Sequence, residues 1–184
     1  MPNWCNNILT LRHADHAMID RAVKAFEKGN LLNEFIPMPD ELQNGNEWCY
    51  ANWGCKWDVG GSDATVSGDG NPNQVEMAFD SPWCPPTDGY GNLEKLGFEI
   101  DAFYYEGGMG FCGRFKDGED DSHELAGNSA WVRRNIPCEI DEAFAISDNM
   151  EKWENEAPQF RRKGGRRMKH IRRLMAHARS CMSS

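Results

Sequence analysis

Hydrophobic and polar residues alternate along several short segments, and this period of two predicts β-strands. In residues 3–12, Leu9 and Leu11 share one face, while Ile8 and Thr10 share the other. Apolar residues on both faces predict a strand in the interior of a sheet. Further strands are predicted at residues 64–67, 74–80, 98–106 and 110–116.

A period close to 3.6 residues appears between Asp15 and Gly29 and predicts an amphipathic helix. Asp15 offers an N-cap and Gly29 a stop. The apolar stripe of this helix consists of Ile19, Ala22, Val23 and Phe26. Shorter helices are predicted at residues 92–96, 140–144 and 150–154, and a longer one at residues 166–182.

The predicted order is strand, helix, strand, strand, helix and strand, followed by one hairpin strand. This order favours an α+β fold, namely a ferredoxin-like βαββαβ sandwich with an extra antiparallel hairpin strand and C-terminal helices. Pro158 and the pair Gly164–Gly165 indicate a boundary near the C-terminus. We therefore expect a domain over residues 1–157 and a basic amphipathic helix within residues 158–184.

Charge divides the chain at about the same place. Residues 1–155 hold eleven Lys and Arg against twenty-eight Asp and Glu, a net charge of −17. Residues 156–184 hold nine Lys and Arg against one Glu, a net charge of +8. An acidic body repels phosphate and attracts basic surfaces, whereas a basic segment does the reverse.

Seven cysteines without a CxxC pair, and a polar N-terminus without a signal-peptide core, favour a reduced cytoplasmic setting. No apolar run reaches the roughly 20 residues of a membrane span. His13 and His16 straddle the predicted helix start, and Cys49 and Cys55 lack a second pair, so we expect no metal site. No cofactor motif is present, and no cofactor is expected.

Tryptophan is concentrated in residues 48–58. One interpretation is an exposed aromatic recess for a planar ligand, a peptide or a nucleobase, with polar groups from Lys56, Asp58 and Glu106. The other is structural, with the indoles packed over the sheet and Lys56 paired with a carboxylate; this is the favoured one. The candidate contact residues are Trp4, Asn6, Trp53, Lys56, Trp57, Asp58, Trp83 and Glu106.

The basic segment offers a second candidate surface. It could bind nucleic acid, dock on the acidic body, pair with a second copy in a homodimer, or bind a protein or membrane surface. Its apolar stripe favours a packed partner, since a purely electrostatic arm needs no stripe. The nucleic-acid candidates are Arg161, Arg162, Lys163, Arg166, Arg167, Lys169, Arg172 and Arg173.

Five motifs follow one another along the chain: Met1–Asn7, Phe35–Pro39, Trp53–Asp58, Ser81–Pro86 and Glu106–Gly113. Together they resemble the YubB-like (Api-like) ferredoxin-like domain family of phage and plasmid proteins. The chain departs from the family at Cys55 and Cys84, where Thr and Ser are usual. The resemblance implies a ferredoxin-like fold and a protein of a mobile element inside its bacterial host, with no established activity.

The leading hypothesis is a non-enzymatic binding protein whose acidic body engages a host protein, as an inhibitor or modulator of a nucleic-acid-acting or defence system. No catalytic residues are assigned, because no nucleophile motif is present and no histidine is tied to a thiol. The alternatives are a nucleic-acid-binding protein acting through the C-terminal helix, and a small-ligand or enzyme site at the tryptophan-rich recess.

Overall fold

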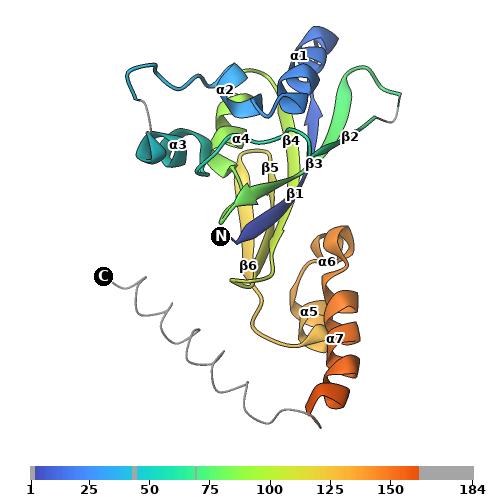
Figure 1. The fold of residues 1–184 in the computed structure, drawn as a ribbon. Coiled ribbons are helices and arrows are strands. Elements are labelled where there is room, and N and C mark those ends of the chain that lie inside the picture. The colour runs from blue at the N-terminus through green and yellow to red at the C-terminus, as the bar shows by residue number, and fades with distance from the viewer. Residues whose placement is uncertain (1–2, 43–44, 69, 162–184) are drawn as a thin grey trace.

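The chain is organised around one antiparallel sheet. The structure, a computed structural model, describes residues 3–42, 45–68 and 70–161. Within these residues, the strands follow the order β2-β3-β1-β4-β5-β6 (Figure 1). Their bounds are β1 Trp4–Arg12, β2 Thr65–Ser67, β3 Gln74–Pro82, β4 Glu99–Glu106, β5 Phe111–Lys116 and β6 Glu119–Glu124. β1 pairs with β3 and β4, which confirms its predicted interior position.

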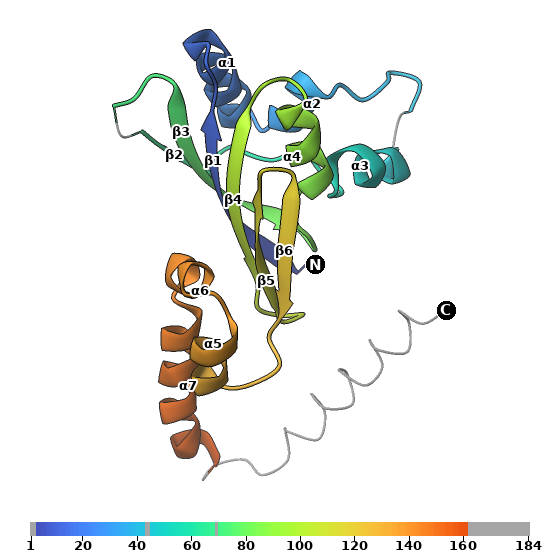
Figure 2. The same cartoon turned by 180° about the vertical axis from the view of Figure 1, so that it is seen from behind.

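Helices form two groups, which Figures 1 and 2 show at different ends of the molecule. The first group is α1 His16–Glu27, α2 Leu31–Phe35, α3 Asn46–Trp53 and α4 Thr87–Glu94. The second is α5 Ser129–Asn135, α6 Cys138–Phe144 and α7 Ile146–Arg161. The fold is therefore α+β, as predicted, and helices follow the sheet toward the C-terminus.

The alternation of side chains places two cores on opposite faces of the sheet. On one face, Leu9 pairs with Met77 and Ala102, and these residues pack with the first helix group. On the other face, Phe103 and Tyr105 pack with a smaller cluster that comes mainly from α5–α7. Helix α1 begins as predicted, because the Asp15 side chain accepts a hydrogen bond from the Ala17 amide (2.9 Å).

The structure corrects several predicted bounds. Helix α4 covers residues 87–94 rather than 92–96, and strand β6, Glu119–Glu124, was not predicted. Helices α2, α3 and α5 were not predicted. For β6 and α3 the physical reason is the lack of a one-sided apolar pattern: β6 is mostly exposed and polar on both faces, and apolar residues do not gather on one side of α3.

Helix α7 runs from Ile146 to Arg161, through the boundary predicted between residues 157 and 158. The predicted helix over residues 166–182 lies outside the described residues. None of the helices that the structure describes has the length and apolar character needed to cross a membrane.

Candidate functional site

Three tryptophans and one lysine meet at the start of β1 and form what we call the tryptophan patch: Trp4, Trp57, Trp83 and Lys56. The ring centroids of Trp4 and Trp57 lie 6.3 Å apart, and those of Trp57 and Trp83 lie 6.0 Å apart. The Lys56 ammonium lies 5.3 Å from the Trp57 ring centroid and 5.5 Å from that of Trp83. These distances are within the range of cation–π attraction.

The patch is open to solvent. The exposed fraction is 45% for Trp4 and 44% for Trp57, and Trp83 is half-buried. The sequence predicted an ion pair between Lys56 and Asp58 or Glu106. Instead, Lys56 lies over the two indole rings, and both carboxylates accept backbone hydrogen bonds elsewhere.

The backbone at Trp83 is in a conformation that is rare for a bulky residue. Its φ angle is 66°, in the left-handed region. Hydrogen bonds on both sides hold it there: the Trp83 amide donates to the Asn3 carbonyl (2.9 Å), and the Ser81 hydroxyl donates to the Cys84 carbonyl (2.7 Å). Conformations of this kind cost on the order of 1–3 kcal/mol and are frequent at functional sites.

Two thiols fix the loops that carry the patch. The Cys84 thiol donates to the Gly54 carbonyl (3.0 Å), which ties the Trp83 loop to the end of α3. The Cys55 thiol donates to the Trp57 carbonyl (3.1 Å). Burial raises the pKa of both thiols, so they stay protonated and able to donate. Thiols in this state are poor nucleophiles.

Trp53 is separate from the patch. It is 4% exposed and belongs to the larger core. Its indole Nε1 donates to the Ile36 carbonyl (3.1 Å), and its ring meets Trp48 edge to face at 5.6 Å. Trp53 is therefore a residue of the core, while Trp57 lies on the surface.

Asp58 holds helix α2 rather than facing the patch. Its carboxylate accepts from the amides of Leu32 (2.7 Å), Asn33 (2.8 Å) and Val59 (2.8 Å). Asn30, at the N-cap position, makes no side-chain capping bond, so Asp58 serves this end of the helix from a distance. Burial raises the pKa of Asp58 against the opposing effect of these hydrogen bonds.

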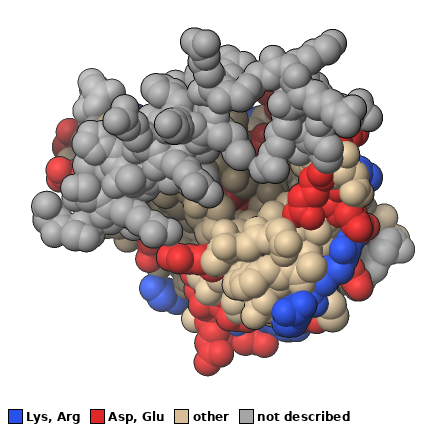
Figure 3. All heavy atoms as spheres, turned by 90° about the horizontal axis from the view of Figure 1, so that it is seen from below, with Lys and Arg blue, Asp and Glu red and all other residues tan. Residues whose placement is uncertain are grey.

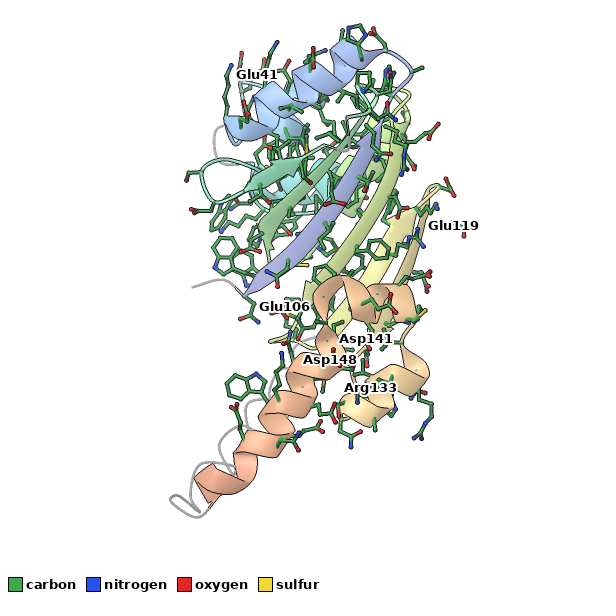
Figure 4. All side chains as sticks on the ribbon, turned by 90° about the vertical axis from the view of Figure 1, so that its right-hand side faces the viewer. Glu41, Glu106, Glu119, Arg133, Asp141 and Asp148 are labelled. Carbon is green, nitrogen blue, oxygen red and sulfur yellow. The ribbon has the colours of Figure 1, made fainter. Side chains whose placement is uncertain are left out.

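Glu106 and Asn6 also have local partners. Glu106 is buried at the end of β4 (Figure 4) and accepts from the amides of Gly108 (2.9 Å) and Met109 in the β4–β5 turn. Asn6 on β1 donates to the carboxylate of Asp80 (2.6 Å) on the adjacent strand β3, and this hydrogen bond is exposed. Asn7 is buried and donates to the Cys5 carbonyl (2.8 Å) and the Ser81 hydroxyl (2.9 Å).

Among the described residues, no group of three His, Cys, Asp or Glu side chains is arranged to hold a metal ion. Burial raises the pKa of Cys5 to about 12 and that of Cys112 to about 11. Of the nucleic-acid candidates, Arg161 is the last residue of α7, and the others lie outside the described residues.

A shallow cavity of about 460 Å³ lies along α1 and α2 and was not predicted. Arg21, Lys24 and Lys28 recur there at helical spacing, which is the sequence signal that could have revealed it. Arg21 spans the cavity through an ion pair with Glu34 (2.6 Å). The other charged side chains that line the cavity carry both signs, and no residue of the tryptophan patch is among its lining residues.

Several cations of the body are already paired with carboxylates. Arg114 pairs with Asp101 (2.7 Å) and Glu139 (3.1 Å). Arg133 pairs with Asp148 (3.0 Å) and Glu151 (2.6 Å), and it can be located in Figure 4. Figure 3 shows a face on which both acidic and basic residues border an uncharged area. The excess of Asp and Glu over Lys and Arg in residues 1–155 gives the body its negative net charge.

The fold and the patch define an α+β protein with an exposed aromatic surface. A scan against protein-family models found no match, and a search of curated proteins also found none. Among solved structures, the chain is similar to a crystal structure of a protein api92 from Yersinia pseudotuberculosis, described with the family model DUF1281. Identity is 24% and the TM-score is 0.41, and the match covers 54% of this chain and 41% of that chain. At this level the similarity says nothing about activity.

Proposed function

We propose that the protein is a non-enzymatic binding module that engages a basic host protein through the tryptophan patch. The observation that carries this proposal is the exposure of Trp4 and Trp57 side by side, next to Trp83 and Lys56. Tryptophan is enriched among the residues that dominate binding energy at protein interfaces.

The charge of the body supports a basic partner. Residues 1–155 have a net charge of −17, and Arg21, Arg114 and Arg133 are paired within the body. Complementary charge accelerates association and selects partners more than it raises affinity. We therefore assign affinity to the aromatic patch and partner selection to the acidic surface.

Catalysis has less support from the described side chains. The thiols next to the patch have raised pKa values, and Asp58 and Glu106 are engaged by backbone amides. A general base needs a free acceptor within reach of the proton that it removes. An enzyme or small-ligand site at the tryptophan recess therefore stays the weaker alternative.

The finer fold assignment is also a proposal. Strands β2, β3, β1 and β4 follow one another in the order of a ferredoxin-like sheet, with α1 between β1 and β2 and α4 between β3 and β4. The strand order supports the ferredoxin-like fold alone, and the resemblance of the five motifs is the basis for proposing a phage or plasmid protein that acts in the host cytoplasm. Its role would be to inhibit or modulate a host nucleic-acid-acting or defence system.

Affinity capture from host lysate tests the proposal. The baits are the full chain, the Trp57→Ala variant and the Leu96→Ala variant, followed by quantitative mass spectrometry. Leu96 is the matched control, because it is 45% exposed and lies outside the patch. We expect one basic protein to lose at least about tenfold in recovery with Trp57→Ala and to be retained with Leu96→Ala. Equal recovery with all three baits would reject the patch as the contact surface.

Nucleic-acid binding through the C-terminal segment is the second candidate function. It is favoured by the nine Lys and Arg residues that follow residue 156, with no Asp or Glu among them. A gel shift with RNA and DNA should show binding by the full chain, weakening steeply with salt. A chain ending at Arg161 should not bind. Binding that is insensitive to both salt and truncation would exclude this function.

A further inference from the structure

Helix α7 carries an apolar stripe that the body covers in part. Ile146 is buried and Met150 is half-buried, and both belong to the smaller core. Trp153, one turn further on, is 75% exposed. The spacings of four and three residues place all three side chains on one side of the helix. Figures 1 and 4 show α7 extending beyond α5 and α6. The stripe therefore continues past the residues that cover its beginning.

The described part of α7 is acidic around this stripe. Residues 146–156 contain four Asp and Glu and one Lys. Glu151 and Glu154 face α5, through Arg133 (2.6 Å) and the Ser129 hydroxyl (2.8 Å). Glu156 lies one turn beyond Trp153 and is exposed. A helix that covers Trp153 must therefore combine apolar residues with positive charge, and a second copy of α7 would bring like charges together.

The chain's own C-terminal segment has both properties. Residues 157–184 contain nine Lys and Arg and no Asp or Glu. Within residues 166–182, apolar side chains recur at helical spacing at Met168, Ile171, Leu174 and Met175. Four residues, including Gly164 and Gly165, separate Arg161 from Arg166, which is a usual length for the connection of two antiparallel helices.

We propose that residues 166–182 fold back on α7 as an antiparallel helix and cover Trp153. Trp153 lies eight residues before Arg161, and Leu174 lies eight residues after Arg166. Because both helices rise by the same distance per residue, this pairing brings Leu174 level with Trp153. The basic residues of the segment then lie beside the acidic residues of α7. This inference is independent of the tryptophan patch.

Fluorine NMR of the full chain, labelled with 5-fluorotryptophan, tests the proposal. Trp153→Phe identifies the Trp153 resonance, and the solvent-isotope shift between H₂O and D₂O reports its exposure. We expect little isotope shift for Trp153 in the unmodified chain and a full shift in Leu174→Glu. Ala176→Glu is the matched control, because it adds the same charge to the same segment away from the apolar stripe. It should leave the Trp153 resonance unchanged.

Three outcomes would overturn the proposal. One is a Trp153 resonance with a full isotope shift in the unmodified chain. Another is protection that depends on protein concentration, with the mass doubled in sedimentation equilibrium, which would assign the stripe to a second copy. The third is protection that is lost after nuclease treatment, which would assign it to nucleic acid. The Trp57 resonance serves as an internal reference and should stay exposed in all variants.

Discussion

Trp53 and Trp57 are four residues apart, at the end of α3 and in the loop that follows, yet their exposed fractions are 4% and 44%. Gly54 separates the two environments. Its φ angle of 81° ends α3, and a side chain at this position would lie 2.9 Å from the Thr87 amide. The indole before this turn is directed into the core, and the one after it joins the surface patch. The comparison shows that one aromatic stretch packs into the core in its first half and lies on the surface in its second, where we propose that it contacts a partner.

The largest expected effect concerns the buried half. Trp53→Ala should lower the free energy of unfolding by about 4 kcal/mol, because it opens a cavity in the core and leaves the Ile36 carbonyl without its donor. Urea denaturation measures this change. Trp53→Phe should cost less, since it keeps most of the volume. A cost below about 1 kcal/mol for Trp53→Ala would contradict its assignment to the core.

Asp58 sharpens the comparison, because it directly follows the exposed Trp57 and yet contributes to stability through its hydrogen bonds to α2. Asp58→Ala should lower the free energy of unfolding by about 2 kcal/mol, since the amides of Leu32 and Asn33 lose their acceptor. Asp63→Ala is the control, because Asp63 is exposed. An equal, small cost for both variants would show that Asp58 does not hold α2.

The pKa of Asp58 gives this cost a pH dependence. Burial raises the pKa of Asp58 in the folded state, so the folded protein binds a proton at this site more tightly than the unfolded chain does. The advantage of the native protein over Asp58→Ala should therefore be largest below the unfolded value of about 4 and should fall as the pH rises through the folded pKa. Urea midpoints of both proteins, measured from below pH 4 to above the folded pKa of Asp58, give the change of this stability difference with pH. The opposite slope would mean that the hydrogen bonds outweigh burial.

Thiol reactivity shows where the buried part of the aromatic stretch ends and the exposed part begins. Cys55 is buried directly before Lys56, whereas Cys138 is exposed on α6. In a Cys181→Ser background, we expect Cys55 to react with a disulfide reagent roughly 100-fold more slowly than Cys138, because it is inaccessible and its pKa is raised. Mass spectrometry of peptides after short exposure gives both rates. Equal rates for Cys55 and Cys138 would show that the exposed part of the aromatic stretch begins before Cys55.

The smallest effect on stability is expected in the exposed half. Trp57→Ala should change the free energy of unfolding by less than about 1 kcal/mol, since much of the ring already contacts water. The same variant should lose the partner in affinity capture. A cost comparable with that of Trp53→Ala, measured in the same urea titration, would show that the patch is part of the core.

Local signals in the sequence predicted much of the sheet and the first helix. β1, β3 and β4 were predicted because their apolar residues alternate, and α1 because an apolar stripe follows a capping residue, Asp15. These features depend on neighbours within a few residues. Strand β6 lacked such a signal, because Glu119–Glu124 carries polar side chains on both faces of an edge strand.

The sequence predicted the site only in part, because the arrangement of the site depends on contacts between residues that are distant in the chain. Asp58 was proposed for the recess, but its partners Leu32 and Asn33 lie more than twenty residues earlier in the chain. Trp83 reaches the patch through a left-handed backbone, which is supported by hydrogen bonds from the Trp83 amide to the Asn3 carbonyl and from the Ser81 hydroxyl to the Cys84 carbonyl. Side-chain type and spacing do not encode such contacts, so the sequence could nominate the tryptophans without separating Trp53 from Trp57.

Hydroxyl-radical footprinting of the tryptophans tests the central claim most directly. The full chain is oxidised alone and in the complex recovered by affinity capture, and peptide mass spectrometry compares the two. We predict that Trp4 and Trp57 are oxidised in the free protein and protected in the complex, while Trp53 is resistant in both. Equal oxidation of Trp4 and Trp57 in the free and bound protein would contradict the tryptophan patch as the contact surface.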